Sequence, residues 1–174
     1  MADFKAATTK KVAILVGPGL EEIEALAPLD VLWRAGVPTD LVSITRSREV
    51  TSSHNVVVTC NRTLDEASLE DYDMLVLPGG IPGMPNLRGD SRVIDAVSAR
   101  VKADRPVAAI CASPSILAGA GLITGRRATA NPGFVNVLEE NDVEVSEDAV
   151  VVDGNLITSR GMATATDFGL EIVR

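Results

Sequence analysis

The sequence predicts one α/β domain in which a mainly parallel central sheet carries helices on both faces. Short apolar segments alternate along the chain with segments of helical periodicity, which is the pattern of βαβ units. Hydrophobic residues make up 46% of the 174 residues but aromatic residues only 3%, so Ala, Val, Leu and Ile must fill the core. The length fits a single domain, which we expect to span residues 11–174 after a polar leader at residues 1–10.

The first half of the chain is expected to supply several strands and one long helix. KVAILV at residues 11–16 is a continuous apolar run that suits a strand buried on both faces. After a Gly-Pro-Gly turn, residues 21–36 repeat apolar side chains at helical spacing and end at a glycine. Further strands are predicted at residues 39–45 (TDLVSIT), 55–60 (NVVVTC, as half of a hairpin) and 72–77 (YDMLVL).

The second half of the chain continues the alternation. We expect a helix at residues 91–103, a buried strand at 107–111 (VAAIC) and a helix at 113–123. Short strands and turns follow over RRATAN, VEVSE, AVVVDG and NLITSR, and a closing helix is predicted from Ala163 to Val173.

Charge and hydropathy exclude several classes of protein. The 16 basic and 24 acidic residues give a net charge of −8 without any basic cluster, which argues against nucleic-acid binding. No stretch reaches the roughly 18–20 apolar residues that cross a bilayer. The leader has no apolar signal-peptide core, so a cytoplasmic location is expected, and with it reduced thiols at Cys60 and Cys111.

Cys111 occupies the most informative position in the sequence. It follows an apolar strand, and Ser113-Pro114 opens the next helix, so the thiol is expected at a sharp strand-to-helix junction. Such junctions lie at the carboxyl edge of open α/β sheets, where ligands bind. Helix N-terminal amides and the helix dipole favour the thiolate at this place. The alternative is a buried structural thiol, the commoner role of a free cysteine.

Two further features are predicted to lie at the same edge. Gly79-Gly80 ends the strand at residues 72–77, and its backbone N–H groups can approach a ligand or an oxyanion closely; a simple tight turn is the alternative. Glu24 lies in the first turn of the first helix and is expected to point toward the sheet, partly buried and with a raised pKa. The acidic pair before it is explained by helix electrostatics alone.

Together these segments resemble the DJ-1/ThiJ/PfpI superfamily, and within it the branch of the Parkinsonism-associated protein and its bacterial relatives. The resemblance rests on GPGLEEIEALAPLDVLWRAG, YDMLVLPGG and VAAICASP, supported by ASLEDYD and ITSRGMATATDFGLEIV, and covers the chain from about Lys11 to Val173. It implies a flavodoxin-like three-layer α/β/α sandwich, a homodimer, and no metal or cofactor.

The resemblance also implies roles for individual residues. The reactive cysteine falls on Cys111 and its acidic partner on Glu24. The backbone donors of an oxyanion site fall on Gly80 and Ala112. Residues implied at the dimer interface are Glu21, Arg34 and His54. Arg160, in TSRG, matches a family position for which the chemistry suggests no role.

The sequence departs from the family at one catalytic position. Many members carry a His-Pro step after the cysteine helix, where this chain has Asn131-Pro132. The chain's single histidine, His54, lies far away in sequence, which argues against a Cys-His peptidase or amidotransferase. Two hypotheses remain open. One is an enzyme for reactive carbonyls, acting on a small α-oxoaldehyde as a glutathione-independent glyoxalase or on glycated substrates as a deglycase. The other is a non-catalytic redox sensor or chaperone whose cysteine is oxidised to sulfinate.

Overall fold

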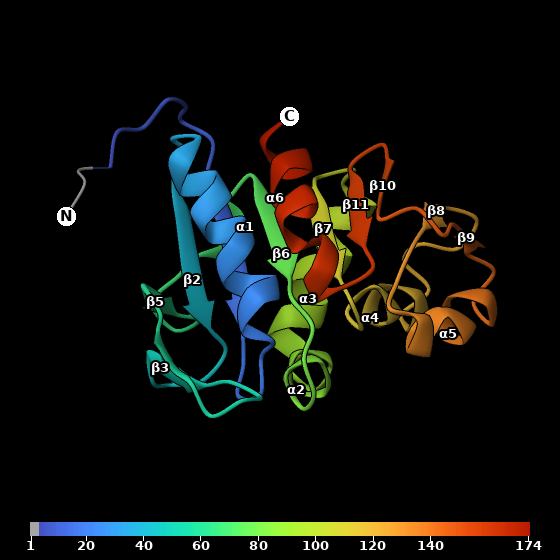
Figure 1. Cartoon of the computed structure of the whole chain (residues 1–174), viewed down its shortest axis with the longest axis horizontal. Coiled ribbons are helices and arrows are strands. Elements are labelled where there is room, and N and C mark those ends of the chain that lie inside the picture. Colours follow the sequence, from blue (N-terminus) through green and yellow to red (C-terminus); the bar gives the residue numbers. More distant parts are fainter. Residues whose placement is uncertain (1–3) are drawn as a thin grey trace.

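A seven-stranded sheet runs through the centre of the computed structural model, which describes residues 4–174 (Figure 1). The strand order is β10-β11-β7-β6-β1-β2-β5, and within the described chain every pairing in this sheet is parallel except that of β10 with β11. The strands are β1 (Val12–Val16), β2 (Thr39–Ser43), β5 (Arg62–Thr63), β6 (Met74–Leu77), β7 (Val107–Ile110), β10 (Val150–Asp153) and β11 (Leu156–Ser159). The predicted fold class is confirmed.

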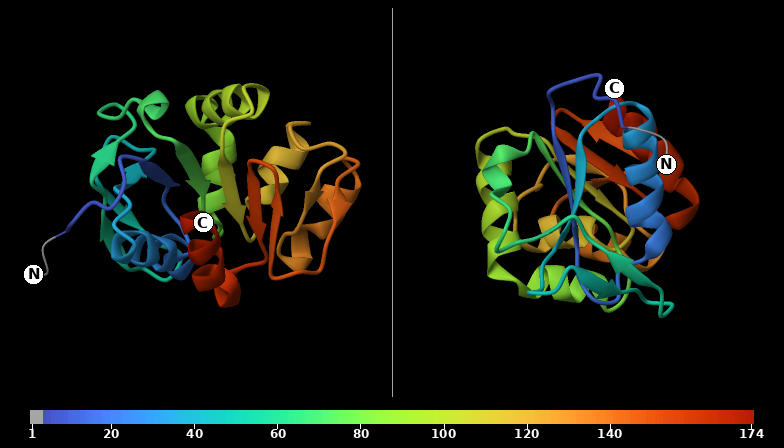
Figure 2. Two further views of the ribbon diagram at one scale, coloured as in Figure 1. Left: turned by 90° about the horizontal axis from the view of Figure 1, so that it is seen from above. Right: turned by 90° about the vertical axis from the view of Figure 1, so that its left-hand side faces the viewer.

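Helices cover both faces of the sheet, as a parallel sheet requires (Figure 2). One face carries α1 (Glu22–Arg34) and α6 (Ala165–Val173), which pack against each other. The other face carries α2 (Gly83–Gly89), α3 (Ser91–Lys102), α4 (Pro114–Gly119) and α5 (Val135–Glu139). The result is a three-layer sandwich.

Strand β1 shows how alternation places the core. Its five residues are all buried, but successive side chains point to opposite faces of the sheet. Ala13 and Leu15 pack into the layer of α2, α3 and α4, whereas Ile14 and Val16 pack into the layer of α1 and α6. A continuous apolar run is therefore what this central position demands, and the predicted strand at residues 11–16 is confirmed.

The remaining elements are short and lie outside the central sheet. The predicted hairpin is formed by β3 (Glu49–Thr51) and β4 (Val57–Thr59), which pair antiparallel. Two short strands, β8 (Arg127–Ala128) and β9 (Glu144–Val145), pair in parallel. Three 3₁₀ turns are η1 (Leu69–Asp71), η2 (Pro132–Phe134) and η3 (Met162–Thr164).

Two helices differ from the sequence-based expectation. The helix predicted at residues 113–123 ends at Gly119, because Gly121 adopts a positive φ of 66° that terminates it. Helix α2 was not expected, since its sequence GMPNLRG contains two glycines and a proline and has poor helix propensity. Tertiary packing of Met84 and Leu87 into the core compensates for that propensity. No helix among the described residues is long and apolar enough to cross a membrane.

Candidate active site

Cys111 sits at the junction between β7 and α4 with a strained backbone. Its φ is 65°, a left-handed conformation that costs a non-glycine residue on the order of 1–3 kcal/mol and that clusters at functional sites. The surrounding chain holds this conformation from both sides. The Cys111 N–H donates to the Ser159 carbonyl at 2.9 Å, and the Cys111 carbonyl accepts from the Asn131 N–H at 2.8 Å. The predicted strand-to-helix elbow is confirmed.

Glu24 lies directly beside this thiol. It belongs to the first turn of α1, is only 1% exposed, and its carboxyl and the Cys111 thiol shift each other's pKa. The carboxyl accepts a hydrogen bond from the Gly79 N–H at 2.9 Å. The structure thus brings together side chains that are 87 positions apart in the chain (111 − 24).

Gly79 must be a glycine for this pair to meet. A Cβ atom on Gly79 would lie 2.6 Å from Glu24 Oε2 and 2.8 Å from Cys111 Cβ, closer than real contacts allow. The adjacent Gly80 has a φ of 98°, and a Cβ there would lie 2.3 Å from the Glu21 backbone nitrogen. Close packing therefore requires glycine at position 79, and close packing together with the positive φ requires glycine at position 80.

The carboxyl and the thiol are electrostatically coupled. Burial raises the pKa of Glu24 from its ordinary 4.5 to about 7, which confirms the expected direction. Burial and the ionised Glu24 raise the pKa of the Cys111 thiol, whereas the N–H groups of Ala112 and Gly80 oppose that shift. Because two adjacent buried groups resist carrying two negative charges, Glu24 loses its proton near neutral pH while the Cys111 thiol keeps its own. Transfer of the thiol proton to the ionised Glu24 would leave the single charge on the sulfur.

The backbone groups expected near the sulfur affect its charge. The N–H groups of Gly80 and Ala112 lower the pKa of the Cys111 thiol. They come from different segments, the turn after β6 and the elbow itself, which β6–β7 pairing brings to the same edge of the sheet. An oxyanion formed beside the sulfur would meet two preoriented donors.

The prediction that this position favours the thiolate is wrong for the free protein. Helix α4 has only six residues, so its dipole is small. Burial and the neighbouring Glu24 raise the pKa of the Cys111 thiol to about 12, and the Gly80 and Ala112 N–H groups oppose only part of that shift.

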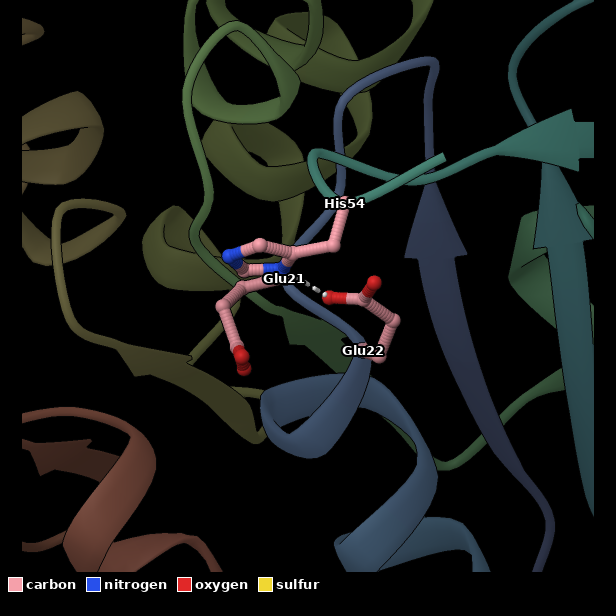
Figure 3. A group of neighbouring side chains, drawn as sticks. All are labelled: Glu21, Glu22 and His54. Carbon is pink, nitrogen blue, oxygen red and sulfur yellow. Dashed lines mark hydrogen bonds and ion pairs between the residues drawn. The ribbon is translucent and has the colours of Figure 1, made fainter. Parts of the chain in front are cut away.

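The residues implied at a dimer interface lie on and around α1. The Glu21 carboxylate accepts from the Glu24 N–H at 2.8 Å and caps the helix. Arg34 is exposed and pairs with Asp30 at 2.7 Å. The exposed His54 donates from Nδ1 to Glu22 Oε2 at 2.8 Å (Figure 3). Contact with a second subunit stays a prediction for all three.

Glu21, Glu22 and His54 also form a group with the geometry of possible metal ligands, since one donor atom from each lies within 4.8 Å of the others. Each member already has a protein partner. Glu22 accepts from the Ser52 hydroxyl as well as from His54, and these bonds lower its pKa to about 2. Such mutual satisfaction accounts for the cluster without an ion. His54 bonds to Glu22 and Ser53 rather than to Cys111, so it forms no Cys-His pair.

Sequence reasoning missed Gly161 at the back of the site. A Cβ atom there would lie 3.6 Å from Asn131 Nδ2, 3.6 Å from Glu24 Oε1 and 3.9 Å from Cys111 Cβ. The Asn131 amide therefore faces the same space as Glu24 and Cys111. The glycine after Arg160 in TSRG was a signal for this close approach, because a glycine directly after a buried strand often marks one.

Comparisons with known proteins place the chain in a family. The DJ-1/PfpI family model matches residues 10–174. The chain belongs to the DJ-1/PfpI family. It is 35% identical over 164 residues to the protein dj-1beta of Drosophila melanogaster, covering 94% of this chain and 88% of that protein. It is 37% identical to DJ-1 homolog B of Arabidopsis thaliana over 95% of this chain, which spans only 37% of the Arabidopsis protein.

A solved structure agrees with this assignment. The crystal structure of Drosophila DJ-1beta superposes with a TM-score of 0.90 at 34% identity, covering 95% of this chain and 89% of that chain. Membership of the DJ-1/PfpI family supports a role as a DJ-1-like stress-response protein. The predicted family is confirmed.

Proposed function

We propose that the chain is a cysteine-dependent enzyme for reactive carbonyls, converting an α-oxoaldehyde such as methylglyoxal to the 2-hydroxy acid without glutathione. The observation that carries the proposal is the cluster at Cys111. A thiol, a carboxyl with a pKa of about 7 and two converging N–H donors occupy one buried corner of the sheet edge. A carboxyl that titrates near the working pH can both take and return a proton.

The first step forms a carbon–sulfur bond. In the state with the proton on Glu24, the Cys111 sulfur attacks the aldehyde carbon and the C=O electron pair moves to oxygen. The Gly80 and Ala112 N–H groups stabilise that oxyanion, and Glu24 then delivers its proton to it. The product is a hemithioacetal on Cys111, with Glu24 now ionised.

The second stage moves hydrogen from the aldehyde carbon to the neighbouring carbon. Glu24 removes the proton from the sulfur-bearing carbon, giving an enediolate, and returns it to the adjacent carbon. The hydroxyl proton of the first carbon passes to the oxygen of the second, leaving a thioester of the 2-hydroxy acid. One carbon is oxidised and its neighbour reduced, so no external oxidant is needed. Water then adds to the thioester, the C–S bond breaks, and the shared proton returns to the pair.

The deglycase variant of this proposal uses the same groups. Attack by Cys111 on the carbonyl-derived carbon of an early glycation adduct would break the C–N bond, and Glu24 would protonate the leaving nitrogen to release the free amine. The hemithioacetal so formed would then rearrange and be hydrolysed to the hydroxy acid as above. Release of free amine together with the hydroxy acid, from an adduct that does not dissociate by itself, separates this variant from action on the free aldehyde.

The test is lactate formation from methylglyoxal by the purified protein in the absence of glutathione. We expect turnover by wild type, loss of at least about 10³-fold in Cys111→Ala, and loss of about 10²–10⁴-fold in Glu24→Gln. Cys60→Ala is the matched control and should retain activity, because Cys60 has no polar neighbour of this kind. Absence of lactate with folded wild-type protein would refute the proposal.

A second candidate function is redox sensing by Cys111. The supporting observation is that three donors, the N–H groups of Gly80 and Ala112 and a protonated Glu24, surround the sulfur and suit a sulfinate. One solved relative is an oxidised DJ-1 from Toxoplasma gondii, 30% identical with a TM-score of 0.88. Mass spectrometry after mild peroxide treatment tests it. Gain of two oxygen atoms at Cys111 is expected, and an unmodified Cys111 thiol would eliminate this function.

We also propose that the protein is a cytoplasmic homodimer. Helix α1 and the adjacent helix α6 expose large apolar side chains, including Ile23 (46% exposed), Trp33 (40%) and Leu170 (51%). The ring of Trp33 contacts that of Phe4, with ring centroids 6.0 Å apart. An exposed apolar surface of this kind suits a second copy. Analytical ultracentrifugation should show that the wild-type protein sediments as a dimer and the Ile23→Asp variant as a monomer.

A further inference from the structure

Beyond Gly161, a cavity of about 490 Å³ opens next to the candidate active site. Its walls include Asn131, Arg160, Gly161 and Met162, and most of the surface that they present is apolar. Asn131 and Gly161 are also the residues that face Glu24 and Cys111. The cavity therefore adjoins the reactive corner across Gly161.

Arg160 is held next to the thiol by the sheet. In the parallel pairing of β11 with β7, Ser159 lies opposite Ile110, so Arg160 and Cys111 both come one residue after this pair. The hydrogen bond from the Cys111 N–H to the Ser159 carbonyl holds the ends of these two strands together. Arg160 also lines a second cavity, of about 390 Å³, on its other side.

The guanidinium of Arg160 lacks a carboxylate partner. Its Nη1 donates to the Glu147 backbone carbonyl at 2.9 Å, and it forms no ion pair with any acidic residue of the described chain. Two nearby arginines behave differently, since Arg126 pairs with Asp153 and Arg127 with Asp148. The Arg160 side chain is half-buried and lines the cavity, and its Nε and Nη2 form no hydrogen bond within the described residues.

A cation in this position matters because the rest of the protein repels anions. The net charge is −8, Glu147 lines both cavities and Glu139 lines the second. A planar guanidinium matches one carboxylate in a bidentate manner. A doubly charged phosphate would find one cation in a cavity that carries acidic residues, and is disfavoured.

We propose that Arg160 binds a carboxylate of the substrate, so that the preferred substrate is an α-oxoaldehyde carrying a carboxylate on its far end. The inference rests on the proposed function for its reactive end. The aldehyde lies at Cys111 and Glu24, the carbon chain crosses Gly161 beside Met162, and the carboxylate pairs with Arg160. Arg160 acts here as a specificity residue and takes no part in bond making.

Direct binding tests the subsite independently of turnover. The probe is 2-hydroxyglutarate, the product that the proposed chemistry forms from 4,5-dioxopentanoate, compared by titration calorimetry with its 5-amide, which lacks the far carboxylate and keeps the one beside the hydroxyl. We expect wild type to prefer the dicarboxylate about 10- to 100-fold, the range of a charge-assisted bidentate pair. Arg160→Gln should lose that preference and Arg160→Lys should restore part of it. Arg88→Gln removes an equal charge from an exposed position of α2 and should keep that preference.

Turnover provides the second arm. The ratio of kcat/KM for 4,5-dioxopentanoate over 4,5-dioxopentanamide should fall at least about tenfold in Arg160→Gln and stay constant in Arg88→Gln. If the protein turns over both substrates and Arg160→Gln leaves the ratio of kcat/KM unchanged, the inference about Arg160 is wrong and the proposed function stands. If the protein prefers the dicarboxylate in binding but turns over neither substrate, the proposed function is wrong and the carboxylate subsite stands. Preference for a phosphate-bearing α-oxoaldehyde over the carboxylate would overturn the stated substrate class.

Discussion

Cys111 and Cys60 are two shielded thiols in one fold, and their surroundings are opposite. Cys60 follows β4, is 3% exposed, and packs among apolar side chains of the α1 layer. Burial by itself raises the pKa of Cys60 to about 11. Cys111 is half-buried, and burial together with the ionised Glu24 raises its pKa to about 12. The two thiols therefore differ in access and in their neighbours, because Cys111 can pass its proton to an adjacent carboxylate whereas Cys60 packs among apolar side chains.

The largest expected difference between the two thiols is their rate of modification. Iodoacetamide should alkylate Cys111 at least about 10³-fold faster than Cys60 in the native protein, because Cys60 reacts only after local opening of the core. Peptide mass spectrometry over a time course measures both rates in the same sample. In denaturant the two rates should converge. Equal rates in the native protein would contradict the comparison.

The next effect concerns stability and distinguishes Glu24 from its neighbour Glu22. A carboxyl whose folded pKa is raised stabilises the fold fully below pH about 4.5, and this contribution is lost as the pH rises through about 7. At pH 8 the Glu24→Gln variant should therefore exceed wild type by up to about 3 kcal/mol in the free energy of unfolding. Urea denaturation at pH 4 and pH 8 measures the change, and the gain should shrink at the lower pH.

Glu22→Gln is the matched control for that measurement and should have the opposite sign. Its pKa is lowered to about 2 by hydrogen bonds from Ser52 and His54, so its contribution is present above pH about 4.5 and lost as the pH falls toward 2. The substitution should lower stability at pH 8. If both variants changed the free energy of unfolding in the same direction, the assignment of Glu24 as the carboxyl with the raised pKa would be wrong.

The smallest expected effect on stability concerns the Gly79-Gly80 turn beside Cys111. Gly80→Ala should cost about 2 kcal/mol, because its φ of 98° and the nearby Glu21 backbone leave no room for a Cβ atom. Gly89→Ala, in α2 with nothing within 4 Å, should change stability by no more than about 0.5 kcal/mol. Thermal unfolding of the two variants side by side checks the difference. A Gly80→Ala variant as stable as wild type would show that the turn adapts.

Much of the fold could be predicted because the signals are local. Apolar runs such as residues 11–16 and 107–111 indicate strands that are buried on both faces, and the structure confirms them. Helix α2 could not be predicted, since packing of Met84 and Leu87 outweighs the poor propensity of its glycines and proline. The short span of α4 was also missed, because apolar spacing alone does not locate a helix end.

The candidate site divides in the same way. The position of Cys111 at an elbow and the Gly79-Gly80 turn were readable from the residues that follow two buried strands. Periodicity suggested that Glu24 faces the sheet, and the family resemblance assigned it to the cysteine. The approach of Gly161 and Asn131, and the unpaired guanidinium of Arg160, had no assignable meaning in the sequence.

By itself, the sequence determined which segments become strands, where the chain must turn sharply, and to which family the protein belongs. These properties depend on side-chain spacing and on backbone freedom over a few residues. Only the tertiary structure decided which of those turns become neighbours. The order β11-β7-β6-β1 aligns the ends of four strands from distant parts of the chain, and this long-range pairing places Glu24, Gly80, Cys111 and Arg160 along one edge. Their coupled chemistry follows from that pairing, because proton sharing and charge recognition require direct contact.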